Sequence, residues 1–339
     1  MEAAMRERLP NLLDRFRGLR VMVVGDLVLD HHLVGDAGRI SREYPVIILN
    51  HASDEFRLGG AANTVANLTA LGAEAIPVGR IGPDPGGDEL LKILERISYT
   101  TDGVVCDPST RTVTKTRIVA GGTYGGGLGQ HLLRVDRLGT GVPDDKTEGE
   151  LARRIGTLSD QTDGFVLSDY GHGTVTPSIA GAVLRLAEDR YVGLDSRHRL
   201  LTYPGVTAAT PNLEEAAEAA GLGLEKETEI EEAGASLRAE LGAEALLITR
   251  GGEGMTLFEP EAEAVHIPVV NKTEVFDVAG AGDTVVAAFT LARLSGGSYL
   301  EAAHLANVAG GLSVRHAGAT PVGAGELREA LDKSSRLLG

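Results

Sequence analysis

The chain has a single cysteine and no tryptophan among its 339 residues, and each shortage excludes a class of protein. With only Cys106, it can form neither an intrachain disulfide nor a thiolate zinc cage, which favours a reducing, cytoplasmic compartment. Aromatic residues make up 4% of the chain, too few for a surface that binds nucleic acid by base stacking. No apolar run approaches the length of a membrane span, and the charged N-terminus lacks the apolar core of a signal peptide.

Positive charge is also scarce. The chain has 48 acidic and 32 basic residues, which gives a formal net charge of -16. This balance disfavours general attraction to nucleic acid or to anionic membranes. We therefore expect small-molecule partners, and an anionic ligand would need a local cluster of cations.

Familiar phosphate and metal motifs are missing as well. The dipeptide Gly-Lys never occurs, so the chain has no P-loop, and no G-x-G-x-x-G motif follows a predicted strand. The zinc motifs H-E-x-x-H and C-x-x-C are also absent. A nucleotide would therefore have to be bound by a structural motif other than these.

What is present is an alternation of short apolar runs with helical patterns. Strands are expected at 19–25, 74–79, 164–168, 191–194, 206–209 and 245–249. The helical spacing of 61–71 ends at Gly72, a typical C-cap residue, and an amphipathic helix is expected at the N-terminus. The alternation predicts an α/β fold with a mostly parallel sheet and ligands at the carboxyl ends of its strands.

Residues 33–56 and 112–137 break this alternation with period-two patterns and turns. They are expected to form a small sheet that stands off the main body. The glycine-rich stretch 121–129 is interpreted as a loop tip, because no helical pattern begins there. Without a repeat or a long linker, we expect one domain over residues 1–339 with an appended β lid.

The strongest candidate for chemistry is FDVAGAGDT at 276–284, which leads into a helical pattern. Gly280, Ala281 and Gly282 would open this helix, where unpartnered backbone N–H groups and the helix dipole can hold a phosphate. Asp283, in the first turn, could accept the proton of an attacking hydroxyl. Alternatively, the glycines only form a tight loop and Asp283 only caps the helix.

This segment closely resembles the C-terminal signature of the ribokinase-like (PfkB) carbohydrate kinases, and LGGAANTVAN at 58–67 resembles their N-terminal signature. SDYGHG at 168–173, TPNLEE at 210–215 and TRGGEGM at 249–255 match further blocks of the family. The resemblance implies a three-layer α/β/α domain with a small β lid. It also implies ATP-dependent phosphorylation of a sugar or sugar phosphate with Mg²⁺, a monovalent cation such as K⁺ as a further candidate, and a homodimer formed through the lid.

Residue by residue, the resemblance implies that Asp283 is the general base and that residues 280–282 hold the transferred phosphate. The positions that match sugar-binding residues of the family are Asp30, Gly59, Gly60, Asn63 and Asn67. Packing at the start of a helix is the alternative for both glycines and both asparagines.

On the nucleotide side, Asn212 and Glu215 match an N-x-x-E block, and Glu215 would help to order Mg²⁺ through water. The same pair is also a possible capping box. Thr249, Gly251, Gly254 and Asn307 match positions near the nucleotide, with a hairpin turn and a helix-surface asparagine as the alternatives.

A phosphorylated sugar would need cations in the site. The candidates are Arg39, Lys115, Arg117 and Arg134 for the substrate, and Arg197 near the nucleotide phosphates. The alternative for each is a solvated or surface-paired side chain.

Within the family, 23–32, 38–46 and the GGAAN block most resemble the kinase half of the heptose 7-phosphate kinase/heptose 1-phosphate adenylyltransferases. This implies conversion of D-glycero-D-manno-heptose 7-phosphate to the 1,7-bisphosphate, and the chain length predicts the kinase step alone. The chain departs from the pattern at Ala279, where Thr is usual, at His172, where Lys is usual, and at Ser196–Arg197. A kinase for another sugar or sugar phosphate, or a catalytically silent sensor, is therefore the alternative.

Overall fold

The computed structural model describes residues 2–121, 129–139, 141–269 and 277–336. Its larger sheet has nine strands in the described residues, and the inner ones are parallel. Two antiparallel strands, β12 and β13, complete one edge. In spatial order the strands are β13 (Val265–Ile267), β12 (Met255–Phe258), β11 (Ala245–Thr249), β10 (Ala208–Ala209), β9 (Tyr191–Ser196), β8 (Gly164–Asp169), β1 (Arg20–Gly25), β4 (Glu74–Ile81) and β5 (Val104–Cys106).

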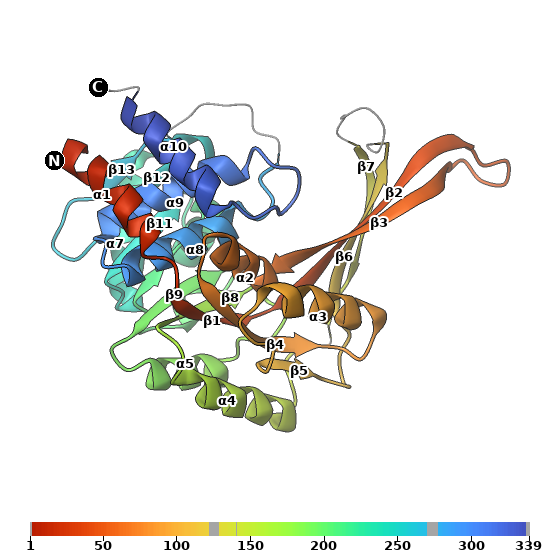
Figure 1. Cartoon of the computed structure of the whole chain (residues 1–339), viewed down its shortest axis with the longest axis horizontal. Coiled ribbons are helices and arrows are strands. Elements are labelled where there is room, and N and C mark those ends of the chain that lie inside the picture. Colours follow the sequence, from red (N-terminus) through yellow and green to blue (C-terminus); the bar gives the residue numbers. More distant parts are fainter. Residues whose placement is uncertain (1, 122–128, 140, 270–276, 337–339) are drawn as a thin grey trace.

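Helices cover both faces of this sheet, because alternate strand residues point to opposite sides. Val21 and Val23 of β1 belong to one apolar core, and Met22 and Val24 belong to the other. The first core is covered by α1 (Glu2–Asp14), α2 (Ala61–Ala70), α3 (Pro85–Ile97), α8 (Ala281–Leu294), α9 (Tyr299–Ser313) and α10 (Ala324–Arg336). The second is covered by α4 (Asp145–Ser159), α5 (Pro177–Ala187), α6 (Leu213–Ala220) and α7 (Glu227–Leu241). The expected three-layer α/β/α architecture is confirmed (Figure 1).

The lid is a four-stranded sheet in the order β3 (Ile47–Gly60), β2 (Leu27–Ile40), β6 (Val113–Ala120) and β7 (Gln130–Arg137). The long β2–β3 hairpin projects away from the main body (Figure 1). The predicted small β lid is confirmed, and its first two strands extend beyond 33–56 at both ends. Most of the glycine-rich stretch at 121–129, namely 122–128, lies outside the described residues.

One smaller expectation is adjusted by the structure. The strand expected at 206–209 consists only of Ala208–Ala209, because the side chain of Thr207 already accepts the N–H of Val192 at the point where the ladder would begin.

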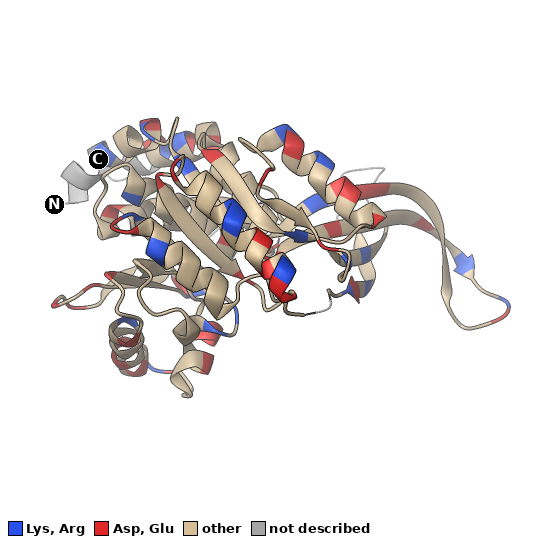
Figure 2. Ribbon diagram, turned by 90° about the horizontal axis from the view of Figure 1, so that it is seen from below, with Lys and Arg blue, Asp and Glu red and all other residues tan. Residues whose placement is uncertain are grey.

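Lys, Arg, Asp and Glu are mixed along the same surface helices in Figure 2. No helix in the described ranges is long and apolar enough to cross a membrane.

Candidate active site

A cavity of about 970 Å³ lies between the carboxyl ends of the main-sheet strands and the lid. One wall comes from the main body and includes Tyr170, Asp195, Glu215 and Asp283. The facing wall comes from the lid and includes Asp30, Lys115, Arg117, Arg134 and Asp136. Segments that are distant in sequence therefore meet in one site, as expected for the carboxyl edge of a parallel sheet.

Asp283 is buried at the base of this cavity and is held by three side-chain donors. Asn63 Nδ2 donates to Oδ2 at 2.7 Å, while the hydroxyls of Tyr170 and Thr64 donate to Oδ1 at 2.8 and 3.0 Å. Burial raises the pKa of Asp283 to about 6, although the three hydrogen bonds act in the opposite direction. The carboxylate does not cap its own helix, because the N-cap residue is Gly280 and no side chain caps it. The helix-cap alternative is therefore wrong.

The helix start beside Asp283 has the shape of an anion hole. Gly280 has φ +79°, and a Cβ there would lie 2.6 Å from Asn63 Nδ2, so the turn requires glycine. A Cβ on Gly282 would meet no atom within 4 Å, because this residue faces open space on the cavity wall. The N–H of Ala281 already donates to the Val278 backbone oxygen at 3.3 Å. The next N–H groups, of Gly282 and Asp283, have no partner among the described residues, so they are available to a phosphate in that space.

Three of the predicted sugar-binding residues, Asp30, Gly59 and Gly60, line the cavity. Asp30 Oδ1 accepts from Arg117 Nη1 at 2.6 Å on the lid wall. A Cβ on Gly59 would lie 2.8 Å from Asp30 Oδ2, and one on Gly60 would lie 2.6 Å from a backbone oxygen. Gly59 therefore permits the close approach of the Asp30 carboxylate, whereas Gly60 permits the close approach of the Asp26 backbone.

The two predicted sugar-binding asparagines, Asn63 and Asn67, do not line the cavity. Both are buried between α2 and α8. Asn67 Nδ2 donates to the Asn63 backbone oxygen at 2.9 Å, and Asn67 Oδ1 accepts from the Thr284 hydroxyl at 2.8 Å. The packing alternative describes Asn67, whereas Asn63 donates to the Asp283 carboxylate.

Strand register decides which predicted cations reach the site. Lys115, Arg117 and Arg134 point to the cavity, and Arg197 lies on the opposite wall. Arg134 also pairs with Asp136 at 2.9 Å. Arg39 lies at the exposed outer end of β2, outside the cavity, because the hairpin carries it away from the body. The surface alternative therefore describes Arg39.

On the nucleotide side, Asn212 and Glu215 line the cavity and also form a capping box. Asn212 Oδ1 accepts the N–H of Glu215 at 2.9 Å, and Glu215 Oε2 accepts the N–H of Asn212 at 2.8 Å. Burial raises the pKa of Glu215. The capping interpretation is confirmed, and it leaves Oε1 of Glu215 for another ligand.

The remaining nucleotide-side residues divide into two groups. Thr249 and Gly251 line the cavity at the end of β11. Gly254 lies in the turn to β12 with φ +97°, where a Cβ would lie 2.1 Å from a backbone oxygen, so the hairpin alternative describes it. Asn307 is buried and donates to the Pro268 backbone oxygen at 2.8 Å, which excludes the helix-surface alternative.

Three residues at the site were not predicted as functional from the sequence. Tyr170 and Thr64 donate to the Asp283 carboxylate. Asp195 lines the cavity, and burial together with Asp283 holds its pKa well above its usual range. Tyr170 lies in the SDYGHG block and Thr64 in LGGAANTVAN, so both belong to motifs of the family resemblance, although neither matches a position with an expected role. Their hydrogen-bond partners are distant in sequence, and nothing local signals them.

The departures from the heptose-kinase pattern lie in different surroundings. Ala279, His172 and Arg197 line the cavity. Burial, together with Lys115 and Arg197, lowers the pKa of His172, so the ring is neutral near pH 7. Ser196 is buried beneath the cavity and its hydroxyl donates to Asp169 at 3.0 Å, so it supports the fold and leaves the wall to Arg197.

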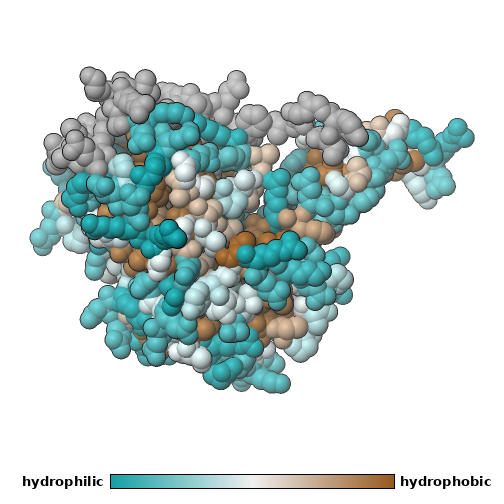
Figure 3. Space-filling view, in the orientation of Figure 1, coloured by the Kyte–Doolittle hydropathy of each residue, from teal (hydrophilic) through white to brown (hydrophobic). Residues whose placement is uncertain are grey.

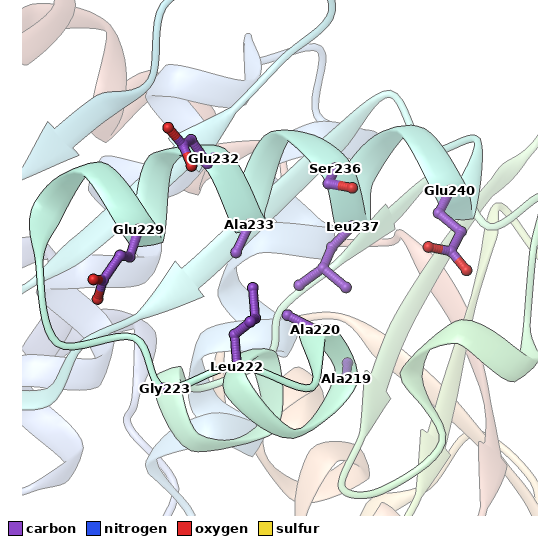
Figure 4. A pocket seen from close by; sticks show the side chains of 10 residues that line it. All are labelled: Ala219, Ala220, Leu222, Gly223, Glu229, Glu232, Ala233, Ser236, Leu237 and Glu240. Carbon is purple, nitrogen blue, oxygen red and sulfur yellow. The ribbon is translucent and has the colours of Figure 1, made fainter.

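A second cavity, of about 340 Å³, lies between α6 and α7 (Figure 4). Its described lining is alanine, leucine, glycine and serine with Glu229, Glu232 and Glu240, and it includes no cation. Such a lining repels phosphate. The cavity beside Asp283 is therefore the candidate active site.

Comparison with known proteins agrees with this geometry. The model of the "pfkB family carbohydrate kinase" matches residues 19–125 and 192–323. The chain is 36% identical over 333 residues to the bifunctional protein HldE of Pelobacter propionicus, covering 96% of this chain and 66% of that protein. It is 38% identical over 330 residues to HldE of Caulobacter vibrioides, covering 95% and 65%. The chain thus spans just under two thirds of the length of these relatives.

Solved structures show the same fold. Arabidopsis thaliana ribokinase, complexed with ribose and ATP, has a TM-score of 0.70 at 21% identity and covers 93% of this chain and 99% of that one. Phosphofructokinase-2 of Escherichia coli, in complex with potassium, has a TM-score of 0.74 at 16% identity and covers 94% and 100%. Both the fold and the matched sequence lead to one assignment: the chain belongs to the pfkB family of carbohydrate kinases, phosphotransferases that use an alcohol group as acceptor.

Proposed function

We propose that this kinase transfers the γ-phosphoryl group of ATP to a hydroxyl of a sugar phosphate, and that its substrate is D-glycero-D-manno-heptose 7-phosphate, converted to the 1,7-bisphosphate. The observation that carries the proposal is the position of Asp283 beside an open helix N-terminus, in a cavity whose facing wall is cationic. Identity of 36–38% to HldE proteins over nearly the whole chain supports the choice of a heptose phosphate.

In the proposed mechanism, Asp283 accepts the proton of the sugar hydroxyl as the phosphoryl group is transferred. A carboxylate has about four acceptor positions, and the three protein donors occupy two on Oδ1 and one on Oδ2. The position left on Oδ2 is the one for the incoming proton. The N–H groups at the start of α8 stabilise the charge on the transferred group, since they are fixed before the reaction begins.

Cations on the lid support a phosphorylated substrate. Lys115 is half-buried, and burial lowers its pKa, an indication that its ammonium is poorly hydrated. Neither Lys115 nor Arg197 forms an ion pair with another residue in the described part of the chain. A sugar phosphate bound with its terminal phosphate near Lys115 and Arg134 would place its other end toward Asp283.

The donor set also fits a divalent cation. Glu215 and Asp195 line the same wall, and the capping box leaves Oε1 of Glu215 unused, so the two carboxyl groups would supply oxygen ligands for a hydrated Mg²⁺. When bound, Mg²⁺ would neutralise charge on the nucleotide phosphates. A dependence on K⁺ is proposed by analogy with the phosphofructokinase-2 structure that contains potassium.

The lid also supports a homodimer. In the register of β2, β6 and β7, His31, Thr116 and Val135 share one face, followed by Leu33, Ile118 and Leu133. This face points away from the cavity residues Lys115 and Arg117 because neighbours along a strand alternate. Leu133 and Val135 are 57% and 51% exposed, and hydrophobic atoms are visible on the projecting lid in Figure 3. We propose that a second copy covers this outer face.

The decisive experiment is a substrate panel with ATP and Mg²⁺, followed by ADP release. Heptose 7-phosphate, fructose 6-phosphate and ribose 5-phosphate would be compared with the corresponding unphosphorylated sugars. The proposal expects the highest kcat/KM for the heptose phosphate and a large loss for every unphosphorylated sugar. A preference for a free sugar would contradict it. ADP release with none of them would favour the sensor alternative.

A further inference from the structure

We propose that Tyr170 is a positioning residue for the base: its hydroxyl occupies Oδ1 of Asp283, so that Oδ2 alone receives the substrate proton. The inference rests on the proposed role of Asp283 as general base. It adds to that role a residue that does not react itself and that no sugar or nucleotide needs to contact.

The contact with Asp283 joins two separate layers of the molecule. Tyr170 follows β8 in the main sheet, whereas Asp283 lies in the first turn of α8. Their 2.8 Å hydrogen bond is directed to the oxygen that Thr64 also contacts. With both hydroxyls on Oδ1, rotation of the carboxylate would break two hydrogen bonds, each with a net value of about 1 kcal/mol. The carboxylate orientation is therefore fixed before substrate binds.

Tyr170 is itself held by the backbone of its loop. The buried carboxylate of Asp26, at the end of β1, accepts the N–H groups of Tyr170, His172 and Thr174, each at 2.9 Å. Three hydrogen bonds to one charged acceptor fasten this short loop to the sheet edge. The phenol ring is thus placed by a loop that is fastened to the main sheet.

The ring also borders the lid. Lys115 Nζ lies 5.7 Å from the centroid of the Tyr170 ring, within the range of a cation–π contact. The charged groups that face the Tyr170–Asp283 pair are Asp30 and Lys115 from the lid, Asp195 from β9 and Glu215 from α6. The surrounding carboxylates and the burial of the site oppose ionisation of Asp283, and the Tyr170 hydroxyl is one of the few groups that favour it.

The experiment is Tyr170→Phe, which removes only the hydroxyl. Without this donor, the ionised form of Asp283 is less stable and its pKa rises, so the acid limb of the kcat/KM profile moves to higher pH. We expect kcat at pH 8 to fall by about 10-fold, because the carboxylate is less well oriented. The KM for ATP should change little, since the hydroxyl donates to the base rather than to the nucleotide.

Tyr299→Phe is the matched control. Tyr299 is also buried, and its hydroxyl also donates to a carboxylate, that of Glu244, but it lies outside the cavity. This variant should keep the wild-type pH profile and kcat. Thermal denaturation of both variants shows whether a change in rate reflects unfolding.

A second variant tests the position of Tyr170 indirectly, by weakening the hydrogen bonds that hold its loop. Asp26→Asn weakens the anchor for three N–H groups and should move the acid limb in the same direction as Tyr170→Phe, which keeps the proposal testable if the Phe variant does not fold. Folded Tyr170→Phe protein with an unchanged acid limb and unchanged kcat would overturn the proposal. Failure of the base assignment would look different: Asp283→Asn would then keep near-normal turnover, whatever Tyr170→Phe does.

Discussion

The two walls of the active-site cavity differ in how their side chains are held. On the main-body wall, Asp283 is fixed by three side-chain donors and Tyr170 by the carboxylate of Asp26. On the lid wall, Arg117 is paired with Asp30 at 2.6 Å. Lys115, by contrast, makes no hydrogen bond with another described side chain, and Arg134 is exposed beside Asp136. From this difference we propose a division of roles, in which the body performs the chemistry and the lid selects the substrate.

This division has a physical basis in the two sheets. The main sheet is buried on both faces, so the residues at its carboxyl ends inherit a rigid frame. The lid has one face toward the cavity and one exposed outer face. Substitutions on the body wall should therefore lower kcat, whereas those on the lid wall should raise the KM of the sugar substrate.

The largest effect is expected for Asp283→Asn. Loss of the general base should lower kcat by two or more orders of magnitude, while ATP binding stays close to wild type because the backbone of the helix start is unchanged. Steady-state kinetics and nucleotide titration calorimetry would measure the two quantities. Turnover close to wild type would remove Asp283 from its proposed role.

Lys115→Met should come next, with a loss of about 10- to 100-fold in kcat/KM for the sugar phosphate, the range for one charge-assisted hydrogen bond. The loss should appear mainly in KM and should be much smaller for the unphosphorylated sugar. Lys92→Met, on the exposed surface of α3, is the matched control. An equal loss for both sugars would mean that Lys115 does not bind the phosphate.

The pH dependence tests the body wall alone. Because burial raises the pKa of Asp283 to about 6, the base loses its negative charge as the pH falls through that value. The kcat/KM should therefore be level above about pH 7 and fall about tenfold per pH unit well below 6. Lys115→Met should leave this acid limb nearly in place. A limb near pH 4 would indicate an unperturbed carboxylate.

The smallest effect on activity is expected at the outer face of the lid. Leu133→Glu places a charge on the face proposed to pair with a second copy, and it should convert a dimer to a monomer in light scattering. Leu222→Glu, at an exposed leucine beside the second cavity, is the control and should not change the mass. A monomeric wild-type chain would contradict the dimer.

The sequence predicted the layers of the fold better than the details of the site. Short apolar runs such as 19–25 are sufficient to locate buried parallel strands, because burial on both faces leaves few alternatives. The GAGD helix start was also predicted, since its glycines and its first-turn carboxylate are adjacent in the chain. Features that depend on residues adjacent in the chain, such as buried strands and helix starts, can thus be predicted from the sequence.

Contacts between residues that are distant in sequence could not be predicted. Asn63 was expected at the sugar and instead donates to a carboxylate 220 positions away. Arg39 and Lys115 looked equivalent as candidate cations, and only the register and length of β2 and β6 separate them. Nothing in the local sequence indicates a role for Tyr170, because the hydrogen-bond partner of its hydroxyl, Asp283, lies in a helix that follows much later in the chain.

The alternation of side chains along β6 has a consequence for how such a lid can change over evolutionary time. Unless a bulge absorbed it, insertion or deletion of a single residue before Lys115 would turn every later side chain to the opposite face of the sheet. Threonine and isoleucine would then face the cavity, and lysine and arginine would lie on the outer face of the lid. A single-residue change of length in this strand would therefore alter the cavity face and the outer face of the lid together.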